Sequence, residues 1–274
     1  MTMQLIDETR TSILNQTLGY QIVEVTRVHD QQHSLEQDQI VEEHPIALVY
    51  NGISHVVMMA TPMDIEVFVI GFSLSEGIVE NIHEIYAIEL ISNEYGISAE
   101  IEISSKAFNT LKEKRRVLVG RTGCGLCGVE SLQQLQLKHN KAVTTPFQPQ
   151  WLAQISPAMS VLNQQQYISQ VTGGAHAAAW VVDGQVQKVF EDVGRHNALD
   201  KLLGYIAKHA LDITSGFVIM TSRASYELVK KCIQFNIALL ACISAPTTLA
   251  IDLARQSQLK LAGFCRHQGF VLYT

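Results

Sequence analysis

Two cysteines lie in a glycine-rich stretch, GRTGCGLCG, at residues 120–128. Cys124 and Cys127 form a C-x-x-C pair, and the four glycines around them let the backbone bend tightly and move. Basic residues lower the pKa of a nearby thiol and so favour the reactive thiolate. Six of them precede or enter the motif: Lys106, Lys112, Lys114, Arg115, Arg116 and Arg121. The stretch therefore indicates reactive thiols.

Three kinds of site use such a pair. A structural zinc ion normally takes four protein ligands, and the sequence has no second C-x-x-C. A thioredoxin-like redox site follows a strand and precedes a helix, which matches a strand predicted at 115–120 and a helix predicted at 130–139. A thiolate that carries a chemical group benefits from an exposed, hinged loop, because its sulfur must visit two sites. The residues alone leave these alternatives open.

The three other cysteines lie in apolar periodic segments. We expect Cys232 and Cys242 to be small core residues. Cys265 differs, since GFCRHQG places it beside Arg266 at a predicted strand end. Strand ends are where ligands bind in α/β folds, which makes Cys265 a candidate binding residue.

Two polar runs could hold phosphate, because each begins a predicted helix and a helix N-terminus attracts anions. In EDVGRHNALDK, Asp192 or Asn197 could also hydrogen-bond the edge of a guanine. This run contains Glu191, Asp192, Arg195, His196, Asn197, Asp200 and Lys201. The second run, MTSRASYELVKK, contains Thr221, Ser222, Arg223 and Ser225. His176, at a predicted strand start, is more typical of a satisfied core histidine.

The composition is that of a globular protein, with 47% hydrophobic and 17% charged residues. The net charge of −6 argues against duplex nucleic acid as a partner. Nineteen acidic and 10 basic residues lie in 1–150, but 7 and 10 in 151–274, so the second half could hold a phosphorylated small molecule. We find no signal peptide, no membrane-length apolar run and an odd number of cysteines, and expect a cytoplasmic protein with free thiols and no membrane partner.

The pattern of apolar residues predicts an α/β protein in two parts. We expect a polar tail at 1–18, an α+β domain at 19–142 that carries the C-x-x-C loop, and a layered α/β domain at 143–274. The first domain is predicted to have a strand at 20–28, a polar loop at 30–39, hairpins around Asn51-Gly52 and 93–96, and a helix from Thr61 to Glu76. A linker is predicted at 143–158. A hairpin at Asp183-Gly184 then precedes alternating helices and buried strands.

Several motifs in a fixed order resemble the formate dehydrogenase accessory sulfurtransferases, the FdhD type of sulfur carrier. The resemblance begins near residue 40 and rests on ATPMDIEVFVIGFSLSEGIV, CGLCG, TGGAHAAA, EDVGRHNALDK, SRASYELVKK, APTTLAIDLA, GFCR and VLYT. It implies that Cys124 accepts sulfur from a cysteine desulfurase as a persulfide, and that Cys127 assists. The sulfur would pass to the molybdenum of a bis-molybdopterin guanine dinucleotide cofactor, which the client formate dehydrogenase needs.

The same resemblance implies a cytidine-deaminase-like fold in the second half, a homodimer and no structural metal. It places the cofactor on Phe264, Cys265, Arg266, His267, Gln268 and Gly269. Deaminase chemistry is not expected, because the sequence has His176-Ala177-Ala178 in place of H-x-E. His267-Gln268, Thr221-Ser222 and Gly123 depart from the commoner residues of the family. The alternative function is a non-catalytic chaperone that binds the cofactor and the apo-enzyme.

Overall fold

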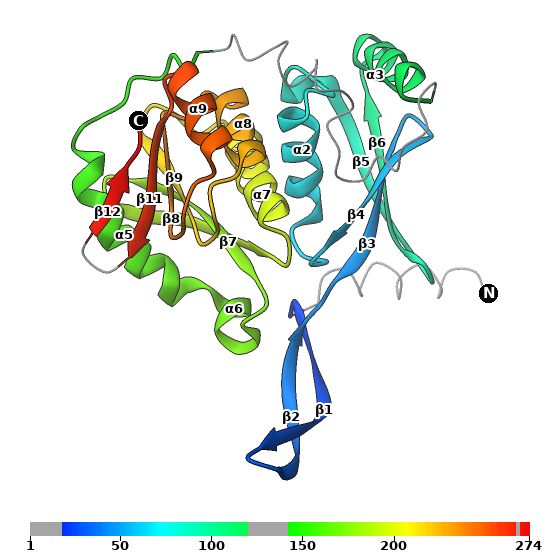
Figure 1. Cartoon of the computed structure of the whole chain (residues 1–274). Coiled ribbons are helices and arrows are strands. Elements are labelled where there is room, and N and C mark those ends of the chain that lie inside the picture. The colour runs from blue at the N-terminus through cyan, green and yellow to red at the C-terminus, as the bar shows by residue number, and fades with distance from the viewer. Residues whose placement is uncertain (1–17, 120–141, 267–268) are drawn as a thin grey trace, which may run out of the picture.

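The structure is a computed structural model that describes residues 18–119, 142–266 and 269–274. These residues form a two-stranded, a four-stranded and a six-stranded sheet, and helices lie between the two larger sheets (Figure 1). None of the helices in this part of the chain is long and apolar enough to cross a membrane. The class is therefore mixed α/β, as predicted.

The four-stranded sheet has the order β4-β3-β6-β5. Asn51 and Gly52 adopt left-handed φ values of 47° and 77°, which closes the predicted β3–β4 hairpin. Helix α2 covers one face of the sheet, where its Phe68 packs near Leu48 in a common core. The elements are β3 (His44–Tyr50), β4 (Ile53–Ala60), α2 (Ile65–Ser75), the 3-10 turn η1 (Ile82–Glu84), β5 (Ile85–Asn93), β6 (Gly96–Ile103) and α3 (Ser105–Val119).

Three predictions for this half differ from the structure. The strand predicted at 115–120 is the end of helix α3, which continues to Val119. Over the whole segment 105–119 the apolar residues recur with a helical period, whereas the short apolar run 117–119 taken alone looks like a strand. Helix α2 also begins at Ile65 rather than Thr61, because Thr61 is tied to the second half of the molecule.

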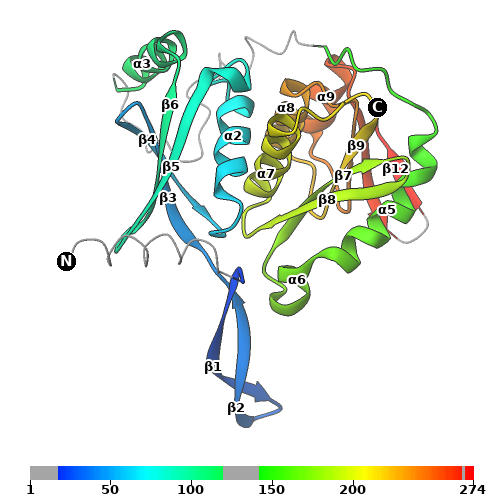
Figure 2. The ribbon, with the colours of Figure 1, turned by 180° about the vertical axis from the view of Figure 1, so that it is seen from behind.

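The polar loop predicted at 30–39 is also wrong, since these residues turn and form strand β2 (Gln32–Val41). This strand pairs with β1 (Tyr20–His29) over its whole length. Asp30 and Gln31 have left-handed φ values of 46° and 68° at the turn. The hairpin projects away from both larger sheets (Figures 1 and 2). Each of its faces therefore mixes polar with apolar side chains, without the alternation of a strand that buries one face.

The six-stranded sheet has the order β12-β11-β10-β9-β7-β8. Strands β9, β10 and β11 are parallel, whereas β7, β8 and β12 join by antiparallel pairs. The elements are α5 (Trp151–Gln165), α6 (Tyr167–Thr172), β7 (His176–Val182), β8 (Gln185–Asp192), α7 (Arg195–Lys208), β9 (Gly216–Met220), α8 (Tyr226–Gln234), β10 (Leu239–Cys242), α9 (Thr248–Gln256), β11 (Lys260–Arg266) and β12 (Gly269–Leu272). The predicted alternation of helices and buried strands is confirmed.

Helices cover both faces of this sheet. α7 and α8 lie between the sheet and α2, while α5 packs on the other face, where Trp151 contacts Phe217. The linker predicted at 143–158 is therefore only partly right, because helix α5 starts at Trp151, which is buried. A deaminase-like arrangement of these layers stays a prediction, as does the domain boundary.

Helices α2 and α7 join the two halves at a crossing of glycines. A Cβ atom on Gly204 would lie 1.8 Å from the carbonyl oxygen of Val67, and one on Gly71 would lie 1.8 Å from that of Asp200. No side chain fits at either position, so the two backbones are in direct contact. The halves therefore share a tight helix–helix interface.

Candidate functional site

The carboxyl ends of the parallel strands gather at one edge of the six-stranded sheet. Strands β9, β10 and β11 end there at Met220, Cys242 and Arg266. Strand β8 ends at the same edge, because two antiparallel pairings relate it to β9 through β7. The loops after β8, β9 and β10 lead into helices α7, α8 and α9. Ligands of open α/β sheets bind at such an edge.

Arg195 and His196, in the first turn of α7, offer free donors at this edge. Arg195 Nε and His196 Nε2 are both buried atoms that make no hydrogen bond in the structure. Burial, together with the charges of Arg195 and Lys231, lowers the pKa of His196 to about 4. A neutral imidazole and a guanidinium beside a helix N-terminus are suited to an oxyanion.

Two carboxylates face His196 and were not singled out from the sequence. Glu227, in the first turn of α8, lies 4.0 Å from His196 Nε2, and Glu76 follows the last residue of α2. Both raise the pKa of His196 against the larger effect of burial. Their place beside His196 depends on how three helices meet, which no local sequence pattern reveals.

His176 lies in the same region and is more than the core histidine that the sequence favoured. Its side chain is half-buried, and its pKa is lowered by burial first and then by the charge of Arg195. The backbone of Thr221, which follows β9, opposes this lowering of the pKa. The edge thus brings together residues from β7, α7 and the loop after β9.

Most of the other polar side chains of EDVGRHNALDK hold the halves together. Asp192 and Lys201 are wholly buried and form an ion pair of 2.8 Å. Asp192 also accepts from the backbone of Thr61 and Gly194 and from the Asn197 amide, at 2.8 to 3.1 Å. Asp192 has therefore no free hydrogen-bonding position for a guanine, and the nearly buried Asn197 donates to protein acceptors.

A second buried ion pair lies between α7, α8 and the end of α2. Lys231 Nζ donates to Asp200 at 2.9 Å, to Glu76 at 2.6 Å and to Ser75 at 2.8 Å. Burial raises the pKa of Asp200 to about 6, although Lys231 opposes the shift. Glu191 in turn accepts from two backbone amides at the start of α6. Only Arg195 and His196 of the seven polar residues thus remain for a ligand.

The stretch expected to bind the cofactor lies at the end of β11. Phe264 is exposed with a left-handed φ of 53° at a bulge, and Arg266 Nε donates to the carbonyl oxygen of Ile243 at 2.8 Å. Cys265 is buried, which raises the pKa of its thiol to about 12. Gly269 begins β12, and His267 and Gln268 lie outside the described residues. The role of this stretch stays a prediction.

Cys124 and Cys127 also lie outside the described residues, so their geometry is not part of the site above. Helix α3 leads toward them in the sequence and carries the basic residues noted earlier. Lys106 is paired with Glu80 at 2.8 Å, and Lys112 lies over the ring of Phe108. Among the described residues, no group of three or more His, Cys, Asp or Glu side chains could hold a metal ion.

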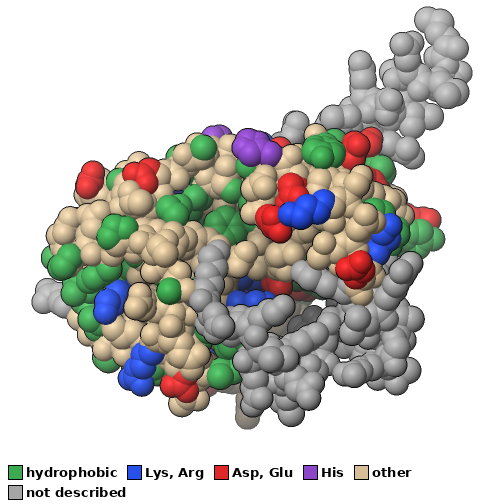
Figure 3. Space-filling view, turned by 90° about the horizontal axis from the view of Figure 1, so that it is seen from above, with side chains coloured by type: hydrophobic (Ala, Val, Ile, Leu, Met, Phe, Trp, Pro, Cys, Tyr) green, Lys and Arg blue, Asp and Glu red, His purple; other side chains and the backbone are tan. Residues whose placement is uncertain are grey.

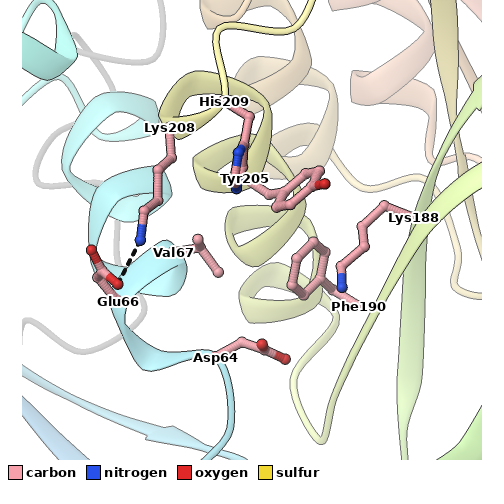
Figure 4. A pocket seen from close by; sticks show the side chains of 8 residues that line it. All are labelled: Asp64, Glu66, Val67, Lys188, Phe190, Tyr205, Lys208 and His209. Carbon is pink, nitrogen blue, oxygen red and sulfur yellow. Dashed lines mark hydrogen bonds and ion pairs between the residues drawn. The ribbon is translucent and has the colours of Figure 1, made fainter.

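A small hollow lies elsewhere, between the start of α2 and the end of α7 (Figure 4). Its lining mixes charges of both signs: Asp64, Glu66, Val67, Lys188, Phe190, Tyr205, Lys208 and His209. Lys208 is paired with Glu66 at 2.6 Å, and Lys188 lies over the ring of Phe190. On the face seen in Figure 3, acidic and basic side chains are likewise interspersed. The sheet edge, with its free donors, is the better candidate.

The fold and the site define an α/β protein with a strand-end edge suited to an anionic ligand. A sequence model of the FdhD/NarQ family matches residues 41–274, and the chain belongs to this family. It is 58% identical to the "Sulfur carrier protein FdhD" of Acinetobacter baylyi, over 99% of this chain and 100% of that protein. The protein of the same name from Chromobacterium violaceum is 51% identical over 93% of this chain and 96% of that one.

The fold is similar to a crystal structure of a putative formate dehydrogenase accessory protein from Desulfotalea psychrophila. The TM-score is 0.73 at 20% identity, over 93% of this chain and 96% of that one. The resemblance drawn from the sequence motifs is therefore confirmed at the level of family and fold.

Proposed function

We propose that this chain is a sulfur carrier that serves the maturation of a formate dehydrogenase. The observation that carries the proposal is 58% identity, over nearly the whole chain, to a protein named as a sulfur carrier. Cys124 is the carrier residue in this proposal. Its thiolate attacks the outer sulfur of a persulfide on a cysteine desulfurase, a new S–S bond forms on Cys124, and the donor cysteine leaves as a thiolate.

The acceptor in this proposal is the molybdenum of a bis-molybdopterin guanine dinucleotide, bound as a substrate. Arg195 and His196 at the start of α7 support this proposal, because their unpaired donors are suited to bind a phosphate group of this ligand. Phe264, Arg266 and Gly269 are the described members of the expected cofactor stretch on the same edge. Cys127 can release the sulfur as hydrosulfide by attacking Cys124, a step that oxidises the two thiols to a disulfide.

Intact-protein mass spectrometry after incubation with a cysteine desulfurase and cysteine tests the carrier role. We expect a reducible adduct of one sulfur on the wild type and on Cys127→Ala, but none on Cys124→Ala. Calorimetric titration with GDP tests the binding role separately, with Arg195→Met as the variant and Arg255→Met, at the end of α9, as the control. An adduct on no form, with GDP binding retained, would favour the chaperone instead.

A further inference from the structure

The start of helix α7, where Arg195 and His196 offer their free donors, is held by residues outside the helix. Its N-cap residue is Gly194, which has no side chain to accept from the amides of the first turn. The residue before it, Val193, donates its backbone N–H to Oγ1 of Thr61 at 3.1 Å. Thr61 follows strand β4 in the first half, 132 residues away in the sequence. The position of this turn therefore depends on a side chain of the other half.

Thr61 directs all of its polar groups at α7 and the turn before it. The residue is fully buried. Its N–H donates to the carboxylate of Asp192 at 3.1 Å, and its carbonyl oxygen accepts from the ammonium group of Lys201 at 3.2 Å. The hydroxyl accepts from Val193. Because a buried donor or acceptor that loses its partner is costly, Thr61 and the turn cannot shift independently of each other.

The same segment of the first half holds the other side of the donor pair. The amide group of Asn197 donates to the carbonyl oxygen of Met59 at 2.8 Å and to Asp192 at 2.9 Å. Asn197 is nearly buried, so these bonds are shielded from water. Arg195 and His196 thus lie in the sequence between two anchored residues, Val193 and Asn197. Both anchors end on the last residues of β4 or on Thr61.

Other contacts join the halves farther along α7. Asp200, which binds Ser75 and Lys231, lies about one turn beyond His196, and the glycine crossing at Gly204 lies about two turns beyond it. These contacts hold α2 against α7 without the hydroxyl of Thr61. The hydroxyl acts instead on the turn that directly precedes the two donors.

We propose that Thr61 is a positioning residue, whose hydroxyl fixes the turn before α7 and so holds Arg195 and His196 in place for an anionic ligand. This inference rests on the proposed binding of an anion at the start of α7. It adds that the first half completes a site whose donors belong to the second half. Without the hydroxyl, the N–H of Val193 has to find water, and the donors lose the fixed geometry that makes a binding site strong.

Calorimetric titration of the full chain with GDP tests the proposal. Thr61→Val replaces the hydroxyl by a methyl group of similar size, and we expect GDP to bind about 10-fold more weakly. Thr61→Ser keeps the hydroxyl and should bind within about 3-fold of the wild type. Ser104→Ala is the matched control, because Ser104 Oγ also accepts from a backbone N–H, that of Ala107 at 3.2 Å, at the start of α3. Its affinity for GDP should equal that of the wild type.

The protonation of His196, followed by NMR without any ligand, is a second readout of the turn. Burial is the largest cause of the low pKa of His196, ahead of the charges of Arg195 and Lys231. A loosened first turn admits water to the imidazole, so its pKa should rise by at least about one pH unit in Thr61→Val. The pKa should stay at its wild-type value in the other two variants. The resonance is identified by its loss in His196→Gln.

The outcomes separate positioning from general stability. Thr61→Val with native circular dichroism, wild-type affinity for GDP and an unchanged pKa of His196 would overturn the proposal. So would an equal loss of affinity in Ser104→Ala. A wild type that does not bind GDP, with a raised pKa of His196 in Thr61→Val, would refute the anion site and support the role of Thr61 in fixing the turn.

Hydrogen exchange of the wild type decides the matter if Thr61→Val does not fold. The amide of Thr61 donates to Asp192 across the two halves. Saturating GDP should therefore slow the exchange of this amide at least about 5-fold, although Thr61 belongs to the other half. An exchange rate that GDP does not change would overturn the proposal.

Discussion

Replacing Gly204 by alanine tests whether the backbone contact of α2 and α7 holds the halves together. At an ordinary helix position this change stabilises a protein by about 1 kcal/mol. Here the new Cβ would lie 1.8 Å from the carbonyl oxygen of Val67, roughly 1.4 Å closer than van der Waals contact allows. Neither atom belongs to a rotatable side chain, so the helices must separate.

The magnitude follows from that separation. Overpacking costs about 1–3 kcal/mol, and a gap near 1 Å removes up to half of the dispersion energy of the contacts along the helix pair. After the gain in helix propensity, we expect Gly204→Ala to lower the free energy of unfolding by about 2–4 kcal/mol. For a chain of this length, that lowers Tm by roughly 5–15 °C.

Urea unfolding, followed by circular dichroism and by the fluorescence of Trp151 and Trp180, measures this change. Gly71→Ala should behave in the same way. Ser160→Ala, at an exposed position of α5, provides a control in which a helix gains an alanine without a clash. A Gly204→Ala protein as stable as the wild type, or more stable, would refute the reasoning.

Three more predictions concern buried charge, ligand binding and a turn. Lys231→Met should destabilise the protein by about 3–5 kcal/mol at pH 7.5, because Asp200 is left without its cation. The folded-state pKa of Asp200 is about 6, above its ordinary value of 3.8, so the stability that this group contributes is lost as pH rises through 6. The loss of stability caused by Lys231→Met, measured by urea unfolding, should therefore be smaller at pH 5 than at pH 7.5. An anion at His196 raises the pKa of this imidazole from its low value of about 4, so calorimetry should show GDP affinity rising as pH falls from about 6 toward 4, and rising less in His196→Gln. Asn51→Ala should lower the free energy of unfolding by about 2–3 kcal/mol, because it removes a residue suited to left-handed φ and two hydrogen bonds to the Ile103 backbone. Asp183→Ala, at the equivalent position of the other turn, should lower the free energy of unfolding by only about 1 kcal/mol.

Residue types and short-range patterns in the sequence correctly predict the Asn-Gly and Asp-Gly hairpins and the alternating helices and strands of residues 185–266. Asn51-Gly52 and Asp183-Gly184 occupy left-handed turns as their types require. Continuous apolar strands separated by amphipathic helices predict the buried sheet, because burial on both faces leaves no alternation. These features depend on residues close together in the chain.

The errors arise where distant contacts decide the structure. Strand β2 is polar because it leaves the body, so it lacks the alternation that identifies a half-buried strand. The linker predicted at 143–158 includes Pro157, which lies inside α5, a helix whose start is fixed by the burial of Trp151. Within EDVGRHNALDK, the sequence cannot tell ligand-binding from structural charges, because the partners of Asp192 and Asp200 include Thr61 and Ser75, more than a hundred residues away.

The glycine crossing also constrains how the chain is made. Helix α2 leaves the ribosome roughly 130 residues before the end of α7 does. At ordinary rates of synthesis this is a wait of roughly 7–26 s. During that time the bare backbone at Gly71 and the hydroxyl of Ser75 have none of their partners from the second half. The N-terminal half therefore completes its folding only late in translation, and until then the face of α2 that α7 will cover is exposed to other proteins.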